Sequence, residues 1–294
     1  MDFISAADLL RVCGEENITI ADAMRERENT AGESNPELTE SKMKKALNIM
    51  RESAHSPIEK PFRSQGGLIG GEAKKLNDRA LSGKSILSGA MSKALIYSQA
   101  VPEVNASMGV IVAAPTAGAS GVLPAVLFAL EEEFGLDEKT VLDGLFTAGA
   151  VGYLLTRNSS VSGASAGCQA EIGSAAAMVS AAAVAMMGGT PEQCLDAASI
   201  TISNMLGLVC DPIAGLVEAP CQSRNAAGAA NALISAEMVL SGIKAIIPFD
   251  EMAQSMLKVG RSIPSELRET AMGGCAATPT GCSHKCKIFS TQGE

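Results

Sequence analysis

The chain has 294 residues, which is enough for one large domain or two small ones. Its formal net charge is −9, from 23 Lys and Arg against 32 Asp and Glu, and the basic residues are dispersed along the chain. This pattern excludes the concentrated basic surface of a nucleic-acid-binding protein. Hydrophobic residues make up 47 % but aromatic residues only 3 %, and there are 29 glycines. Such small apolar side chains favour tightly packed helices.

The first 60 residues are the polar part of the chain. Residues 5–16 predict a short helix, and Thr19 can cap a second helix that runs to about residue 29. Asn35 followed by Pro36 predicts the start of a third, because proline suits the first helical position. We expect Pro57 to break that helical pattern.

A glycine-rich loop, 64–76, leads into the next helix. Loops of this kind can bind an anion at a helix N-terminus, but the spacing fits neither the phosphate-loop nor the dinucleotide-binding pattern. From residue 85 onward the sequence is mostly apolar with helical periodicity, and only 109–114 suggests a strand. The sequence therefore predicts an all-α fold.

The later helices have clear starts. Asp137 can cap one helix, and Thr190 to Gln193 form a capping box with proline in the first turn. The segment 157–167 is expected to be a polar turn. We predict one domain over 1–294, with more polar helices in about 1–60 and a cysteine-containing tail in about 271–294.

The N-terminal sequence and the least polar run bear on location. MDFISAADLL lacks the basic start and long apolar stretch of a signal peptide, so we expect a cytoplasmic protein that keeps its eight cysteines as thiols or metal ligands. The run 172–187 has 16 residues without a charge. Because a bilayer needs about 20, we predict a buried core helix and no membrane span.

Three cysteines fall at predicted helix ends. Cys168 follows a glycine at the head of an Ala-rich helix, and Cys210 and Cys221 each stand next to a proline. Thiols so placed can converge on one inorganic centre, whereas Cys194, in the middle of a helix, is expected only to pack. The alternative is that all are small buried hydrophobes, since no CxxC pair is present.

The residues of common acid–base mechanisms are scarce. The only histidines are His55 and His284, which argues against a Ser-His-Asp arrangement and against a histidine-bound zinc. The lysines lie mostly at surface-type positions, which argues against a Schiff base. Cysteine, and whatever cysteine binds, is left as the candidate for catalysis.

Four long motifs carry a resemblance to a known family: APTAGASGVLPAVL, SGASAGCQAEIGSAAAM, LGLVCDPIAGLVEAPCQSRNAAGA and GGCAATPTGC. Together they resemble the α chain of the iron–sulfur L-serine dehydratases (serine ammonia-lyases) of the bacterial two-chain type. The resemblance implies an all-helical, Ala/Gly-rich catalytic domain around a 4Fe–4S cluster. It also implies a separate β chain and conversion of L-serine to pyruvate and ammonia without pyridoxal phosphate, in amino-acid degradation and gluconeogenesis.

The family's three cluster ligands fall on Cys168, Cys210 and Cys221. The family also has a cysteine near the C-terminus that can occupy the fourth iron when substrate is absent, and Cys282 fits that role best. About a dozen residues follow Cys282, and Cys275 and Cys286 lie close by, so these two are alternatives. Three thiolates leave one iron open as a Lewis acid for serine, and such an iron should react with oxygen.

Several polar residues near these motifs are candidates for substrate binding. Thr116, Gly118 and Ser120 could bind the serine carboxylate at a helix start, or serve only as a helix cap. Arg224 could form a bidentate carboxylate contact, or a structural ion pair. Further candidates are Asn105 and Ser160, for which capping is the alternative. No residue is assigned as the general base.

Two other functions are compatible with the cysteines. One is a related cluster-dependent lyase acting on L-cysteine or L-threonine. The other is a non-catalytic iron–sulfur or zinc protein, such as a redox sensor or scaffold, in which the fourth thiolate would stay bound. The Gly- and Ser-rich loops around the cysteines argue against this second function, because a closed structural site needs no polar pocket.

Overall fold

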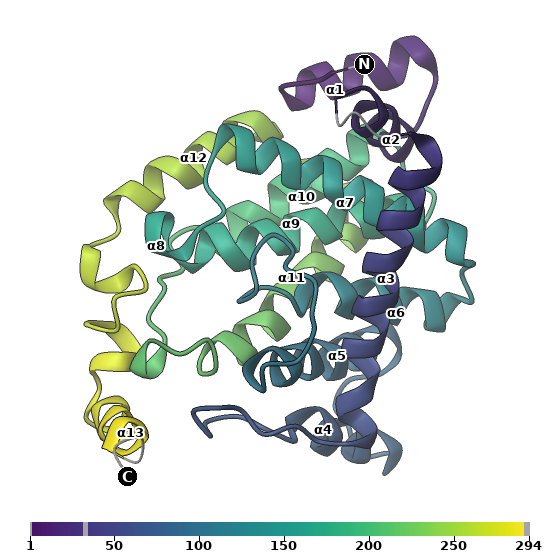
Figure 1. Ribbon diagram of the computed structural model, residues 1–294. Helices are drawn as coiled ribbons and strands as arrows, with labels where there is room; N and C mark the ends of the chain where they lie inside the picture. Colours follow the sequence, from purple (N-terminus) through teal and green to yellow (C-terminus); the bar gives the residue numbers. More distant parts are fainter. Residues whose placement is uncertain (1, 32–34, 291–294) are drawn as a thin grey trace.

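The computed structural model describes residues 2–31 and 35–290 and shows an all-helical protein (Figure 1). Within these ranges the chain forms thirteen α-helices and three short 3₁₀ helices, and it contains no β-strand. An isolated bridge pairs Cys210 with Arg268. The predicted all-α fold is confirmed, and the segment 109–113 forms no regular element.

The helices are joined by connections that range from a single residue to the long segments 107–121 and 206–220. The first seven are α1 (Ala6–Glu16), α2 (Ile20–Ala31), α3 (Pro36–Glu59), α4 (Glu72–Leu81), α5 (Gly89–Ala106), α6 (Val122–Phe134) and α7 (Glu138–Asn158). The others are α8 (Gly163–Ala166), α9 (Cys168–Met186), α10 (Pro191–Met205), α11 (Cys221–Leu240), α12 (Phe249–Ser262) and α13 (Pro279–Ser290). The 3₁₀ helices are Ile213–Gly215, Ser265–Leu267 and Gly274–Ala277.

The predicted helix starts are confirmed by their side-chain caps. Each capping oxygen accepts a backbone N–H three residues further on, at 2.8 to 3.3 Å; the caps are Ser5, Thr19, Asn35, Asp137 and Thr190. Thr190 and Gln193 form the expected capping box. Local sequence therefore specifies where these helices begin.

The prediction that Pro57 breaks the third helix is wrong. Helix α3 continues through Pro57 to Glu59 and contains the proline in its last turn. Proline removes one backbone hydrogen bond there, but its ring is buried, so packing against the core offsets part of that loss. Figure 1 shows α3 as a long helix on one side of the molecule, where it packs against α5 and α7.

Helix α9 is the centre of the core and packs against α6, α7, α10 and α11. Small residues permit this close packing. A Cβ added at Gly152 of α7 would lie 2.7 Å from Met178, and one at Gly228 of α11 would lie 2.7 Å from Ile172. Helix α9 is long and apolar enough to cross a membrane, but 89 % of its apolar window is buried in the protein, as predicted for a core helix.

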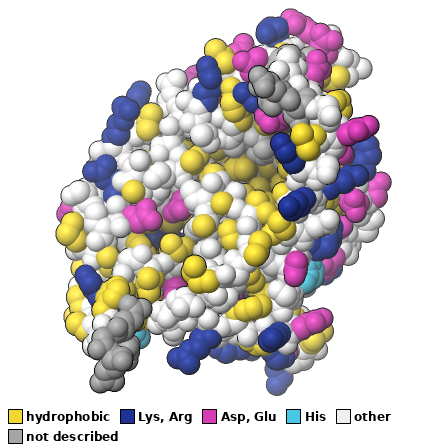
Figure 2. All heavy atoms as spheres, viewed as in Figure 1, with side chains coloured by type: hydrophobic (Ala, Val, Ile, Leu, Met, Phe, Trp, Pro, Cys, Tyr) yellow, Lys and Arg dark blue, Asp and Glu magenta, His cyan; other side chains and the backbone are white. Residues whose placement is uncertain are grey.

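Two segments contain helices that the sequence reading did not predict. The segment expected to be a polar turn includes the single-turn helix α8, and the tail includes α13. Thr278 accepts the N–H of Gly281 at 3.0 Å, so Thr278-Pro279 is a cap followed by proline at the first position. The single domain over 1–294 stays a prediction. Figure 2 shows hydrophobic side chains gathered over the middle of one face, with charged residues mostly around it.

Candidate metal centre

The three cysteines predicted at helix ends are free and buried; Cys168 and Cys221 do begin helices, but the prediction is wrong for Cys210, which pairs with Arg268 in an isolated bridge. Cys168 is the first residue of α9, Cys221 is the first residue of α11, and Cys210 lies in the connection between α10 and α11. Their exposed fractions are 2 %, 8 % and 2 % respectively. Cys194 is also buried but lies within α10 against the core, as predicted for a packing residue.

The sulfurs of Cys168 and Cys210 lie within 4.8 Å of each other and of a Glu171 carboxylate oxygen. The backbone brings them together at the head of α9. Gly167 has φ +77°, a conformation that favours glycine, and a Cβ there would lie 2.8 Å from the carbonyl oxygen of Leu208. The backbone N–H of Gln169 donates to that same carbonyl at 2.9 Å. The segment that carries Cys210 is therefore held directly against the start of α9.

Side-chain contacts fix the same segment from other directions. Arg224, in the first turn of α11, donates to the carbonyl oxygen of Val209 at 2.9 Å and lies 2.7 Å from an Asp211 carboxylate oxygen. The N–H of Cys210 donates to Leu267 at 2.8 Å, and its carbonyl oxygen accepts from Glu269 at 2.6 Å. Cys210 is thus held by α11 on one side and by the C-terminal segment on the other.

The thiols are electrostatically coupled. A hydrogen bond from the Cys210 thiol lowers the pKa of Cys168, and the positive charge of Arg224 lowers it further against the effect of burial. The same hydrogen bond, together with burial, raises the pKa of Cys210. Burial, with a contribution from the Cys168 charge, raises the pKa of Cys221 to about 12. Thiolate ligands must lose their protons, so a bound cation would be needed to stabilise all three as thiolates.

Glu171 is the residue of this site that the sequence reading missed. It lies one helical turn after Cys168, on the same face of α9, and its carboxylate accepts the Thr116 hydroxyl at 2.5 Å. Burial raises its pKa, and the nearby charge of Glu269 raises it further. The signal was present in the sequence, because the Cys-x-x-Glu spacing at a helix head places both side chains together.

Two glycines pack closely against Cys210 and Glu171. A Cβ at Gly163 would lie 3.0 Å from the Cys210 sulfur and 2.9 Å from a Glu171 oxygen, and one at Gly118 would lie 2.8 Å from Glu171. Larger side chains at either position would collide with these groups. Buried free thiols grouped with a carboxylate suit a metal ion or an iron–sulfur cluster, because soft thiolates are the usual ligands of such groups.

The structure places the predicted substrate-binding residues unevenly. Thr116 and Gly118 contact Glu171 and belong to the site, and Arg224 lies beside it in the ion pair with Asp211. Ser120 and Asn105 both donate to the carbonyl oxygen of Ala117, at 2.7 and 3.4 Å. The Ser160 hydroxyl accepts the N–H of Ser162 at 3.3 Å, within its own turn. The roles of these six residues in binding serine stay predictions.

The tail cysteines also differ in position. The backbone N–H of Cys275 donates to Asp211 at 2.6 Å, so this residue adjoins the segment that carries Cys210. Cys282 and Cys286 are exposed on α13, and the Cys282 thiol lies 3.7 Å from the carbonyl oxygen of Ala276. The assignment of Cys282 as the tail ligand stays a prediction. Of the three tail cysteines, Cys275 is the one hydrogen-bonded to Asp211, the residue after Cys210.

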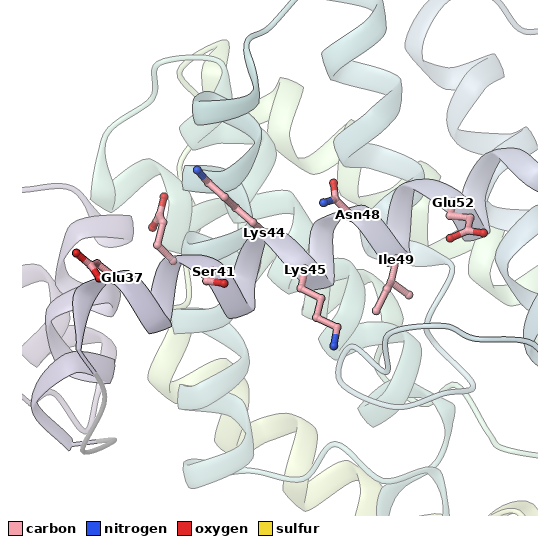
Figure 3. Close-up of a pocket in the computed structure, with 8 residues that line it drawn as sticks. Glu37, Ser41, Lys44, Lys45, Asn48, Ile49 and Glu52 are labelled. Atoms are coloured by element: carbon pink, nitrogen blue, oxygen red, sulfur yellow. The ribbon is translucent and has the colours of Figure 1, made fainter.

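A cavity of about 580 Å³ lies elsewhere, along α3 (Figure 3). Every residue that lines it comes from this one helix, including Lys44 and Lys45, and none comes from the elements that carry the buried thiols. The figure shows their side chains projecting from the helix surface. This is a solvated helix face, and we assign it no function.

A helical protein with buried free thiols gathered beside a carboxylate at the head of its central helix has the architecture of a cysteine-held metal or cluster centre. The chain belongs to the serine dehydratase alpha chain family, which it matches over residues 15–276.

Three relatives show the extent of the similarity. The probable L-serine dehydratase alpha chain of Bacillus subtilis (strain 168) is 47 % identical over 287 residues, which are 98 % of this chain and 95 % of that protein. The L-serine dehydratase alpha chain of Peptoniphilus asaccharolyticus is 45 % identical over 277 residues, which are 94 % and 95 % of the two chains. An L-serine dehydratase of Helicobacter pylori (strain J99) is 36 % identical over 286 residues, which are 94 % of this chain and 62 % of that protein.

Proposed function

We propose that this chain is the catalytic α subunit of an iron–sulfur L-serine dehydratase. The observation that carries the proposal is the set of three buried thiols, two of them with sulfurs within 4.8 Å of the Glu171 carboxylate and of each other. Relatives named L-serine dehydratase alpha chain, which align over nearly the whole chain, support the same substrate. The reaction removes the serine α-proton and hydroxyl as water, and the resulting aminoacrylate hydrolyses to pyruvate and ammonia.

Cys168, Cys210 and Cys221 would hold a 4Fe–4S cluster, and Cys282 would supply the tail thiolate, with Cys275 and Cys286 as alternatives. When bound, such a cluster supplies an iron with an open position, which polarises the hydroxyl that leaves. The protein keeps the thiols buried and holds them in fixed positions relative to one another. Arg224 contributes to this through its contacts with Val209 and Asp211 on either side of Cys210.

The substrate would bind near the cluster, on the side of Gly163 and Gly118. Thr116, Gly118 and Ser120 would orient the serine carboxylate from the turn before α6, with Arg224, Asn105 and Ser160 as further binding residues. Glu171 adds a carboxylate that is oriented by the Thr116 hydroxyl and adjoins the thiols. We infer that Glu171 contacts the substrate, because its carboxylate adjoins both glycines and the thiols of Cys168 and Cys210.

We also propose that the chain works in the cytoplasm with a separate β subunit. Two relatives of similar length are named as alpha chains, and this chain spans only 62 % of the Helicobacter pylori relative, which is named simply as L-serine dehydratase. The remaining part of such a longer protein is where a β-type domain would be found.

The test is pyruvate formation from L-serine by anaerobically prepared protein co-expressed with its β chain, repeated after exposure to air. We expect turnover that is lost in air and returns with ferrous iron and a reductant. L-Cysteine and L-threonine are assayed in parallel. Turnover that is stable in air contradicts the cluster, and faster turnover of L-cysteine or L-threonine contradicts the substrate. A fully loaded protein that turns over none of the three would instead be a redox sensor.

A further inference from the structure

The buried carboxylate of Glu218 has a set of contacts that the proposed chemistry does not use. Glu218 lies three residues before Cys221 and is 3 % exposed. Its oxygens accept three hydrogen bonds, from the Ser64 hydroxyl at 2.7 Å, the N–H of Gly66 at 2.6 Å and the N–H of Leu68 at 2.9 Å. A segment near the N-terminus is thereby joined to the loop that leads into a predicted ligand.

All three donors are uncharged and come from the glycine-rich segment 64–71. Within the described residues no Lys or Arg forms an ion pair with Glu218, so these donors replace the water that the buried carboxylate loses. Hydrogen bonds to an ionised acceptor are the stronger kind, at about twice the strength of neutral ones. The glycine-rich segment thus binds a carboxyl group that belongs to the protein itself.

The segment is pressed closely against the loop that it holds. A Cβ on Gly66 would lie 2.5 Å from the Leu216 side chain and 2.8 Å from the Glu218 carboxylate. Gly67 has φ +70°, which glycine adopts without strain. The N–H of Gln65 donates to the carbonyl oxygen of Ala106 at 2.9 Å, which fixes the segment to the end of α5.

The backbone of Glu218 continues this connection to the ligand itself. Its carbonyl oxygen accepts the N–H of Gln222 at 2.9 Å, so it completes the first turn of α11, which contains Cys221. The side-chain amide of Gln222 donates to the backbone carbonyl oxygen of Gln99 at 3.1 Å. The side-chain amide of Gln99 donates in turn to the backbone carbonyl oxygen of Gln222 at 2.9 Å. Cys221 is therefore held between the glycine-rich segment and α5.

We propose that Glu218 is a positioning residue for the cluster: by binding the glycine-rich segment 64–71, it holds the first turn of α11 so that the Cys221 thiol meets the iron. This inference rests on the proposed function. Beyond that function, it makes the segment 64–71, which is far from the cysteines in sequence, a support of the metal centre.

The test compares Glu218→Gln with Glu103→Gln. In the first variant the amide NH₂ must face at least one of the three donors, so at least one hydrogen bond is lost. Glu103 is the matched comparison because it is also fully buried but holds only the far end of the segment, where its carboxylate accepts the N–H of Ala73 at 2.9 Å and is also hydrogen-bonded by the backbone of Gly71. Ser64→Ala removes one donor and serves as a milder variant if Glu218→Gln folds poorly.

Two measurements follow on each anaerobically purified protein. The first is the rate of iron release to a chelator, with the EPR spectrum of the reduced cluster recorded beforehand. We expect release about tenfold faster in Glu218→Gln, with a smaller increase in Ser64→Ala and an altered spectrum. The second is tryptic cleavage after the exposed Arg63 in the metal-free protein, which should be faster in the same two variants. Glu103→Gln should release iron within about twofold of the wild-type rate.

The inference is overturned if Glu218→Gln releases iron and is cleaved at wild-type rates, or if Glu103→Gln releases iron as fast as Glu218→Gln. The latter result would mean that any loss of a buried carboxylate loosens the centre. These outcomes are separate from failure of the proposed function, in which the wild-type protein itself binds no iron or does not turn over L-serine.

Discussion

Arg224 offers a quantitative test of how the segment around Cys210 is held. Its guanidinium is 2.7 Å from the Asp211 carboxylate, and the two side chains are 15 % and 3 % exposed. Removing one partner of a buried ion pair costs about 3 kcal/mol or more, because the other charge is left buried. At about 2 °C per kcal/mol for a chain of this size, Arg224→Met should lower the melting temperature by about 6 °C.

The assay is thermal unfolding of the metal-free protein followed by circular dichroism, so that substrate and cluster do not contribute. Arg224→Lys keeps the charge and should lose less, about 1 kcal/mol, because the bond to Val209 depends on the guanidinium. The double variant Arg224→Met with Asp211→Asn should lose less stability than the two single variants lose together. An Arg224→Met protein that melts within about 1 °C of wild type would refute the structural role of this pair.

Three further predictions concern the thiols and one buried acid. Cys210→Ser should lose the cluster whereas Cys194→Ser should keep it, and equal iron contents would contradict the ligand assignment. Cys282→Ser should change the EPR spectrum of the substrate-free cluster, and a change confined to Cys275→Ser would move the tail ligand to Cys275. Burial raises the pKa of Glu103 above 4.5, so its charged form costs stability as pH rises above that value. The melting temperature of Glu103→Gln relative to wild type should therefore increase from pH 4.5 toward neutrality, and a constant difference would argue against this effect.

Much of the fold could be predicted from local sequence. Helix starts are specified by a cap and the residues after it, which is why the starts after Thr19, Asn35 and Thr190 were predicted correctly. Pro57 was misjudged because its burial depends on distant parts of the chain. Helix α13 was missed although Thr278-Pro279 is a start signal, because Gly and Cys around it suggested irregular structure.

The candidate site was predictable in its cysteines but not in its connections. The helix-start positions of Cys168 and Cys221 follow from the glycine and the proline that precede them, whereas Cys210 was placed at a helix end and lies in a connection. Two contacts depend instead on how the helices pack. Arg224 pairs with Asp211, and Glu218 is bound by the glycine-rich segment 64–71. Such contacts join residues far apart in sequence, and no local pattern encodes them.

The bridge between Cys210 and the segment Leu267 to Glu269 has a consequence for how the protein matures. During synthesis the three predicted ligands emerge from the ribosome before the segment that pairs with Cys210. A growing chain therefore contains these thiols before it contains the segment that holds Cys210 in place. The arrangement of the thiols is complete only after the C-terminal part has joined the fold, so the finished protein would bind the proposed cluster better than a nascent chain would.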